Sequence, residues 1–509
     1  MAGINYYDVT EWTVGNPYKD IGEVINSIIA DIKRRQRDSD NDGGGKPGAV
    51  IYIPPGDYHL ATQVVIDISY LKIMGSGHGF TSSSIRFNTP EAEWADWHEL
   101  WPGGSRILVD ISPEADDREW AGAAFYVERS GNPRISSVEF ADFCIDGLHF
   151  VDDGSGKADP ENTYTNGKTG IYIASAQDSF RITGMGIVYL EHGITSYHAD
   201  ALTIHDNFIA ECGNCIELRG SGQASKITDN LIGAGYKGYS IYAQNFGGLL
   251  VTANNIFPRG TSSVHFAGVM RSSVTGNRFH SFYPGMLVFK DGCSENLVSA
   301  NHFLRDHEPW APMQGYDNGL DDLYGLLYIS GNHNSIIANH ISETIDTRYI
   351  KPSGAAPVII RVVSGKGNYI SDNHIVATTE GPEIQAAEGP EGQAAEGPEV
   401  QAAEGPEVQA AEGPEVQAAE GPKVQAAETQ EGLDTQIPGT QAPEAGSCFS
   451  AQVGALLTAG ELQELEVITV LVESAAFQNT VLDSGSDAQV IMDRTVNAFR
   501  ATPTPGRNG

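Results

Sequence analysis

The amino-acid sequence predicts an all-β protein folded as a right-handed parallel β-helix, with an amphipathic helix capping its N-terminal end. A short pattern recurs in which a β-branched residue, two small or polar residues, Asn, any residue and an apolar residue follow one another. Five successive asparagines of this pattern are 23, 24, 23 and 24 residues apart. This period is too short for a helical-hairpin repeat, and no leucine-rich consensus accompanies it. It suits one coil of a β-helix, in which each coil stacks on the last and buries its inward side chains. The five residues are Asn207, Asn230, Asn254, Asn277 and Asn301.

The recurring asparagine has a structural role in this interpretation. Asn tolerates a left-handed backbone at a corner, and stacked Asn side chains can bond the neighbouring coil. The pattern returns at Asn339 and Asn373, after intervals of 38 and 34 residues. We expect the additional residues to emerge as loops on one face of the solenoid, and such a face is often the binding face. Trp310, Asp321 and Asp322 lie in the longer interval, either as a sugar-binding set or in a loop packed at an oligomer interface.

Four segments follow one another along the chain. Residues 1–45 form the N-terminal cap, because Asp20-Ile21-Gly22-Glu23 has a capping-box pattern and apolar residues at 21, 24, 25, 28, 29 and 32 make one helical stripe. Residues 46–380 form the parallel β-helix. Residues 381–446 repeat an acidic octad with a proline in every copy and almost no aromatic residues, which predicts a disordered linker. Residues 447–509 contain two strand-like segments, 479–483 and 488–491, that we expect to close the far end of the β-helix.

The composition excludes some classes of protein. The formal net charge is −35, from 31 Lys and Arg against 66 Asp and Glu, which argues against nucleic acid as a partner. Part of this acidity lies in the linker, where residues 380–444 hold 15 acids and one base. There is no run of 18 apolar residues, and the first 19 residues lack the features of a secretory signal. We therefore expect a cytoplasmic protein, or a secreted one if the chain is a processed or recombinant form.

Two carboxylates stand out in a stretch dense in reactive groups. Asp200 and Glu211 can divide the work of glycosidic chemistry, because one acid can protonate the departing oxygen while the other supports the oxocarbenium-like centre. They are 11 residues apart, about half a coil, which within one subunit allows them to lie on different sides. Either local loops bring them together or a neighbouring subunit completes the site. The alternative is that both are ordinary turn carboxylates.

Two further patterns are compatible with metal or redox chemistry. Cys212-Gly213-Asn214-Cys215 has the CxxC spacing, but no second pair accompanies it, so we expect stacked, buried thiols. Three histidines, His302, His340 and His374, each follow an asparagine of the repeat. They are compatible with a metal site, but equal placement in a repeat more often produces a stacked structural row.

Seven segments of the chain carry a resemblance to a known family: Asp20–Asn26, Ile53–Tyr58, His198–Leu202, Ile209–Cys215, Gly222–Ala224, Phe257–Gly260 and Asn318–Gly325. With these segments the chain resembles glycoside hydrolase family 91 from about residue 5 to 376 and again near 481–485. The resemblance implies a trimer with active sites between subunits, a general acid/base at Glu211 and a fructosyl-positioning or stabilising partner at Asp200. It also points to His198, Arg259, Trp310, Asp321, Asp322 and Gln244 as substrate-binding residues, and it implies no metal and no organic cofactor. The octad linker is a departure from the family.

This family contains inulin fructotransferases, which release difructose anhydrides from inulin, and difructose anhydride III hydrolases, which open that cyclic disaccharide to inulobiose. The absence of an export signal favours the hydrolase, because inulin is an extracellular polymer. Gln244 favours it too, since it stands where we expect Glu in a transferase. The fructotransferase is the alternative, and a noncatalytic carbohydrate-binding β-helix is a further one. A polysaccharide lyase on the same pectin-lyase-like solenoid would require calcium-binding acids and a cationic groove, for which we see no Lys/Arg cluster.

Overall fold

The computed structural model describes residues 5–38, 48–79, 103–111, 118–131, 134–148, 166–174, 178–234, 238–257, 262–281, 284–305, 324–346, 358–380, 467–482, 489–492 and 497–500. The chain divides into one compact unit made of residues 1–382 and 464–509, and a second made of residues 383–463. The second unit, which contains most of the predicted linker, lies outside the described residues. The described part contains no helix long and apolar enough to span a membrane.

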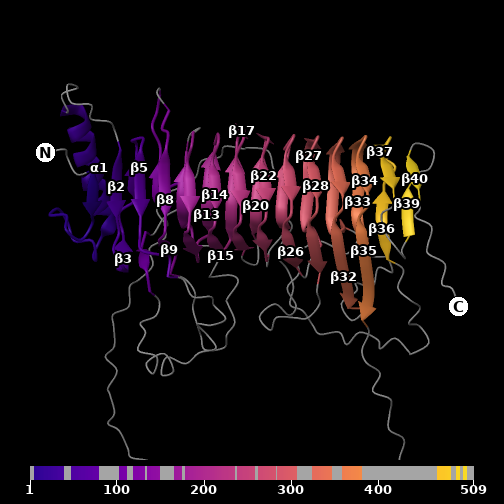
Figure 1. Cartoon of the computed structure of the whole chain (residues 1–509), viewed down its shortest axis with the longest axis horizontal. Coiled ribbons are helices and arrows are strands. Elements are labelled where there is room, and N and C mark those ends of the chain that lie inside the picture. The colour runs from indigo at the N-terminus through magenta and orange to yellow at the C-terminus, as the bar shows by residue number, and fades with distance from the viewer. Residues whose placement is uncertain are drawn as a thin grey trace, which may run out of the picture. The chain divides into compact units, whose positions relative to one another are not determined.

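The described part of the first unit forms three long parallel sheets, which we call sheets A, B and C. One strand from each makes a coil, and successive coils follow one another in order along the chain (Figure 1). Sheet A contains β1 (Tyr6–Asp8), β2 (Ala49–Tyr52), β5 (Leu71–Met74), β8 (Val138–Ala141), β11 (Arg181–Thr183), β14 (Thr203–His205), β18 (Lys226–Thr228), β22 (Leu250–Thr252), β25 (Ser273–Thr275), β28 (Leu297–Ser299), β31 (Ser335–Ile337), β34 (Tyr369–Ser371), β38 (Thr480–Leu482) and β40 (Ala498–Arg500).

The other two sheets run beside sheet A. Sheet B contains β3 (Gly56–Leu60), β6 (Ser105–Val109), β9 (Cys144–Asp146), β12 (Gly186–Val188), β15 (Phe208–Cys212), β19 (Leu231–Ala234), β23 (Asn255–Ile256), β26 (Arg278–Ser281), β29 (His302–Arg305), β32 (His340–Asp346) and β35 (His374–Glu380). Sheet C contains β4 (Val64–Ile66), β7 (Ala123–Val127), β10 (Thr169–Ile173), β13 (His192–Tyr197), β16 (Asn214–Arg219), β20 (Tyr239–Gln244), β24 (Ser262–Ala267), β27 (Leu287–Ser294), β30 (Leu327–Asn332), β33 (Val358–Lys366), β36 (Ile468–Val472) and β39 (Gln489–Met492), with β37 (Ala476–Phe477) paired to β33. A short sheet pairs β17 (Gly222–Gln223) with β21 (Phe246–Gly247). The predicted all-β parallel β-helix is confirmed.

The core lies inside the coils, where columns of apolar side chains stack from one coil to the next. In sheet A the central residue of each short strand points inward, as Ile204, Ile227 and Val251 do in register. Aromatic rings stack in the same manner, and the centroids of Phe279 and Phe303 in sheet B are 4.5 Å apart. β-Branched and aromatic residues dominate these columns because they pack well on a pleated surface.

The asparagine ladder is confirmed as a structural feature of the corner between sheets A and B. Asn277, for example, donates from Nδ2 to the carbonyl of Val251 (2.9 Å) and to Oδ1 of Asn301 (3.0 Å). Its own Oδ1 accepts from the backbone N–H (3.0 Å) and Nδ2 (2.9 Å) of Asn254. The ladder asparagines are almost fully buried, so these bonds satisfy groups that water cannot reach. The connected residues are Asn207, Asn230, Asn254, Asn277, Asn301, Asn339 and Asn373.

One detail of the prediction for this ladder is wrong. The left-handed backbone does not fall on the asparagine but on the exposed residue before it, as at Asp206 (φ 58°), Ala253 (φ 56°) and Ala300 (φ 54°). The asparagine side chain must point into the coil to reach its partners. The left-handed step of the tight turn therefore falls one position earlier, where the side chain faces solvent.

A second asparagine ladder, which the sequence analysis missed, runs along the corner between sheets C and A. Asn296, Asn334, Asn368 and Asn479 are linked by bonds from Nδ2 to Oδ1 of the next member, at 3.0, 3.1 and 2.9 Å. The ladder continues at Asn497, whose Oδ1 accepts the backbone N–H of Asn479 (2.8 Å). The spacings are irregular because long connections separate its members, and a search at one fixed period does not detect them.

Helix α1 (Ile21–Asp38) and strands β36 and β38 lie toward the two ends of the coil stack. The helix buries its apolar stripe, including Ile21, Val24 and Ile28, and packs beside β4. Asp20 caps it, since its Oδ1 accepts the backbone N–H of Gly22 at 3.0 Å. At the other end, β36 pairs with β33 and β38 pairs with β34. The residues after 467 therefore add strands to the same two sheets, C and A, that the chain formed before residue 381. The domain boundaries at 45, 380 and 446 stay predictions.

Candidate functional site

The corner between sheets B and C receives most of the long connections. β29 ends at Arg305 and β30 begins at Leu327, and β35 ends at Glu380 while β36 begins at Ile468. Not every connection at this corner is long, since a single residue joins β15 to β16. At the corner between sheets A and B, two residues join each sheet A strand to sheet B along the first ladder. The long β5–β6 connection is an exception, since it runs from sheet A to sheet B. Long loops gathered at one corner of a regular scaffold are typical of a binding face.

Glu211 lies at this corner, in the middle of the stack. It is 6% exposed, it has a left-handed backbone (φ 53°), and the register of β15 on β19 shifts between Ala210 and Cys212. Tyr189 one coil earlier has φ 59° and donates its N–H to the carbonyl of Glu211 (3.1 Å), so the corner itself imposes this conformation. A bulge re-aims the side chain it carries, and a buried carboxyl at such a position is typical of functional sites.

Asp200 lies at the opposite corner, in the connection from sheet C to sheet A. It pairs with Gln223 of the next coil through an isolated bridge, and its Oδ2 is 4.0 Å from a guanidinium nitrogen of Arg134. His198 precedes it with φ 53°, and its Nδ1 accepts the backbone N–H of Ser221 at 3.2 Å. This bond leaves the proton on Nε2 of neutral His198. The carboxylate and the imidazole thus belong to one corner.

Asp200 and Glu211 of one chain do not come together. Glu211 precedes the start of β16, whereas Gln223, the bridge partner of Asp200, follows its end. The six residues of β16 at about 3.3 Å each separate the two corners by ~20 Å. Two acidic side chains cannot span that distance. Of the two explanations left open by their spacing, the described residues do not support local loops that unite the acids within one subunit.

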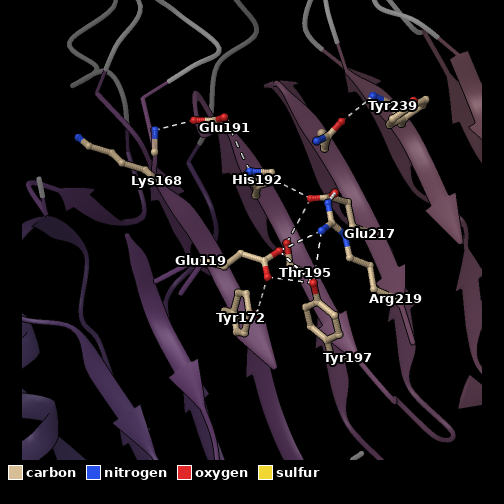
Figure 2. A network of polar contacts seen from close by, with 12 residues as sticks. Glu119, Lys168, Tyr172, Glu191, His192, Thr195, Tyr197, Glu217, Arg219 and Tyr239 are labelled. Carbon is tan, nitrogen blue, oxygen red and sulfur yellow. Dashed lines mark hydrogen bonds and ion pairs between the residues drawn. The ribbon is translucent and has the colours of Figure 1, made fainter. Parts of the chain in front are cut away.

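A polar network covers the outer face of sheet C between these two corners (Figure 2). Glu217, 1% exposed, accepts from Arg219 at 2.5 Å, and its other oxygen lies 2.5 Å from Nδ1 of His192. Arg219 also donates to Glu119 at 3.0 Å. Glu119 further accepts from the hydroxyl of Tyr197 (2.9 Å). Tyr172 of β10 donates to Glu119 as well (3.2 Å), so the network joins side chains of β10, β13 and β16 to a connection about a hundred residues before Arg219.

The charges in this network depend on one another. Burial raises the pKa of Glu217, but the hydrogen bond and charge of His192, followed by Arg219, outweigh burial and lower it. Burial lowers the pKa of His192, but Glu217 outweighs burial and raises it. The pair is therefore held as carboxylate and imidazolium over a wider pH range than the isolated groups. The sequence analysis assigned no role to His192, Glu217, Arg219 or Glu119. The alternation of apolar Ile216 and Leu218 with polar Glu217 and Arg219 along β16 was the available signal for the latter two, whereas Glu119 lies outside sheet C.

The remaining predicted substrate-binding residues are placed only in part. Gln244 is the last residue of β20. Because Ala243 is paired in register with Leu218, Gln244 lies beside Arg219 on the next coil of sheet C. Gln244 thus lies toward the end of sheet C that leads to sheet A, as do His198 and Asp200. Arg259, Trp310, Asp321 and Asp322 lie outside the described residues.

The CxxC pair is a pair of buried thiols, as predicted. Cys212 and Cys215 are free, fully buried, and donate to backbone carbonyls of Ile187 (3.6 Å) and Ile209 (3.8 Å). Burial raises the pKa of Cys215 well above its ordinary value, which disfavours a reactive thiolate. Among the described residues, no group of three or more His, Cys, Asp and Glu lies close enough to hold a metal ion.

Comparison with known proteins relates the chain to inulin fructotransferase and DFA-IIIase. A family model described as the β-helix repeat of inulin fructotransferase matches residues 300–503, and one described as periplasmic copper-binding protein (NosD) matches residues 147–339. The DFA-I-forming inulin fructotransferase of Arthrobacter globiformis is 45% identical over 377 residues, 73% of this chain and 89% of that protein. The DFA-IIIase of Arthrobacter chlorophenolicus A6 in complex with DFA-III is 60% identical, covering 99% of both chains with a TM-score of 0.76. The same enzyme without its lid, in complex with GF2, is 57% identical and covers 99% of this chain and 100% of that chain, also with a TM-score of 0.76.

Proposed function

The chain belongs to glycoside hydrolase family 91, the family of the inulin fructotransferases and difructose anhydride III hydrolases, and on that basis we propose that it hydrolyses difructose anhydride III to inulobiose. The observation that carries the choice of activity is the similarity to DFA-IIIase. That similarity reaches 60% identity over 99% of both chains, against 45% over 73% of this chain for the fructotransferase. Gln244 in place of an expected Glu supports the same choice.

In this proposal Glu211 is the general acid/base. It protonates the glycosidic oxygen that departs from one fructosyl unit, and it then activates the water that completes hydrolysis. Asp200 positions the fructosyl unit and stabilises the positive charge that develops at its anomeric carbon. The low exposure of Glu211 supports this role, because a proton donor is most effective where water is scarce.

The same proposal requires two subunits. Because Asp200 and Glu211 of one chain lie at opposite ends of β16, a site that uses both needs Asp200 from one protomer and Glu211 from its neighbour. A closed homotrimer repeats this interface three times and leaves no subunit without a partner. Gel filtration with light scattering measures the predicted mass of three chains, and a monomer at assay concentration would contradict this part of the proposal.

The second candidate is inulin fructotransferase. It is favoured by the family model for the inulin fructotransferase repeat and by the 45% identical relative. The two activities share the fructosyl step and differ in the group that attacks it. A hydroxyl of the substrate closes the anhydride in the transferase, whereas water opens it in the hydrolase.

The activity test incubates the full chain separately with difructose anhydride III and with inulin, and identifies the products by chromatography. We expect inulobiose from the anhydride. Cyclic anhydride accumulating from inulin would show the transferase instead, and no product from either substrate would favour a noncatalytic carbohydrate-binding β-helix.

The role of Glu211 is tested with one variant and a matched control. Glu211→Gln should lower kcat at least a hundredfold, the lower range for the loss of a general acid, while the trimer stays intact. Glu295→Gln removes an exposed carboxylate that pairs with Arg271, and should leave the rate unchanged. An undiminished rate in Glu211→Gln would remove this residue from the mechanism.

A cytoplasmic location completes the proposal. A disaccharide anhydride is small enough to be imported and opened inside the cell, unlike the inulin polymer. Fractionation of the native host with antibodies to this protein measures it directly, and recovery of the protein from the culture medium would contradict the proposed location.

A further inference from the structure

Three histidines form a column on the outer face of sheet B, far along the chain from the candidate acids. His302, His340 and His374 are the first residues of β29, β32 and β35, and they are paired in register. Each directly follows a member of the first asparagine ladder, whose side-chain hydrogen bonds fix the backbone at this corner. The column is therefore presented by a rigid part of the fold.

Two of these imidazoles make a close contact. Nδ1 of His340 and Nδ1 of His374 are 3.0 Å apart, and their ring centroids are 4.9 Å apart. Both side chains are exposed, and Nε2 of His340 faces the hydroxyl of Ser342 at 3.1 Å. His302 is a ring neighbour of His340, with centroids 5.1 Å apart. Two neutral imidazoles explain this contact if one donates a hydrogen bond to the other.

The same separation suits two ligands of one metal ion. Imidazole nitrogens lie about 2.0–2.1 Å from a bound divalent transition metal. Two such ligands at a right angle are about 3.0 Å apart, whereas a tetrahedral angle requires about 3.4 Å. Right-angled imidazole ligands belong to the square-planar or octahedral geometries that Cu²⁺ and Ni²⁺ adopt.

We propose that His340 and His374 form a surface site for a divalent transition metal ion, with Nδ1 of each as ligand and water in the other positions. This site is separate from the proposed fructan chemistry. It has two protein ligands, whereas a site in which protein groups fill most of the coordination positions has three or more. The bound ion links β32 to β35, the last sheet B strand before the octad segment. Arg278 is paired in register with His302 and lies in the same column, on the side away from His340. Its positive charge, which would repel a metal cation, is therefore farthest from His374.

The test uses the full chain without a polyhistidine tag and measures Ni²⁺ binding by titration calorimetry at pH 7.5. We expect one ion per chain, and at least a tenfold loss of affinity in either His340→Ala or His374→Ala. His205→Ala, which removes a histidine from sheet A, is the matched control and should bind as the wild type does.

A second readout is the thermal midpoint, which Ni²⁺ should raise in the wild type and in His205→Ala but not in the double variant His340→Ala/His374→Ala. Circular dichroism of the metal-free double variant shows whether it is folded, so that lost binding is not confused with lost structure. No saturable binding by the wild type, or equal binding by the folded double variant, would overturn the proposal and leave the contact as an imidazole–imidazole hydrogen bond.

Discussion

Removing one asparagine from the middle of the first ladder should cost far more than its size suggests. Asn277→Ala deletes the acceptor of the Asn254 backbone N–H and the donor to the Val251 carbonyl, both in the buried interior. The bonds to the side chains of Asn254 and Asn301 are lost as well, although Asn254 Nδ2 keeps its bond to a carbonyl of the preceding coil at 2.9 Å.

The magnitude follows from these groups. A buried backbone N–H left without an acceptor costs about 1–3 kcal/mol, and each of the other lost bonds contributes about 0.5–1.5 kcal/mol net. The free energy of unfolding should therefore fall by about 4 kcal/mol. Because repeat proteins gain stability from contacts between neighbouring coils, the loss acts on the coils on both sides of position 277.

Urea unfolding followed by circular dichroism measures this change, and native-state hydrogen exchange at the amide of Asn254 measures the lost bond directly. Asn255→Ala is the matched control, because Asn255 is half-buried and its side-chain oxygen accepts a long, 3.3 Å hydrogen bond from Arg278 on the outside of the coil. We expect it to lose less than about 1 kcal/mol. Equal losses in the two variants would refute the reasoning.

Two further predictions concern charge and thiols. His192 has a raised pKa in the folded chain, so its stabilising contribution is complete below about pH 6.5 and is lost as the pH rises through the folded value. His192→Gln should therefore lower the urea midpoint more at pH 5.5 than at pH 8.5, and an equal loss at both values would contradict the paired state with Glu217. Burial raises the pKa of Cys293 to about 11, and Cys144, Cys212 and Cys215 are buried with it. A Cys448→Ser variant should thus show no thiol that reacts with Ellman's reagent until it is unfolded, and rapid reaction in the native protein would show that one of these thiols is accessible.

The regular part of the fold is predictable from the sequence because one physical requirement repeats in each coil from Asn207 to Asn373. Each of these coils places an asparagine where a buried corner needs a side chain with both a donor and an acceptor, and a β-branched or aromatic residue two or three positions away. The second ladder obeys the same requirement, yet connections of unequal length separate Asn296, Asn334 and Asn479, so no fixed period marks it. The position of the left-handed residue in each turn was also not predicted. Exposure of the side chain to solvent sets this position rather than residue type, and both Ala300 and Asp206 occupy it.

The candidate site is less predictable than the scaffold. The sequence indicated Asp200 and Glu211 but left open whether one chain brings them together, because that depends on which corner each occupies. The strand bounds place them at opposite ends of β16. The network around Glu217 depends on residues paired across coils and on Glu119, which is 100 residues before Arg219 in the chain. Such long-range partners have no local sequence signal.

The most direct test of the proposed shared site mixes two inactive variants, Asp200→Asn and Glu211→Gln, after unfolding and refolding together. If each site takes Asp200 from one protomer and Glu211 from the next, random mixing in a trimer restores about one site in four. The account therefore predicts that the mixture recovers about a quarter of wild-type turnover of difructose anhydride III, while each variant refolded by itself recovers none. A mixture of verified hetero-trimers that stays as inactive as its parents would show that both acids act within one chain, and would contradict the account.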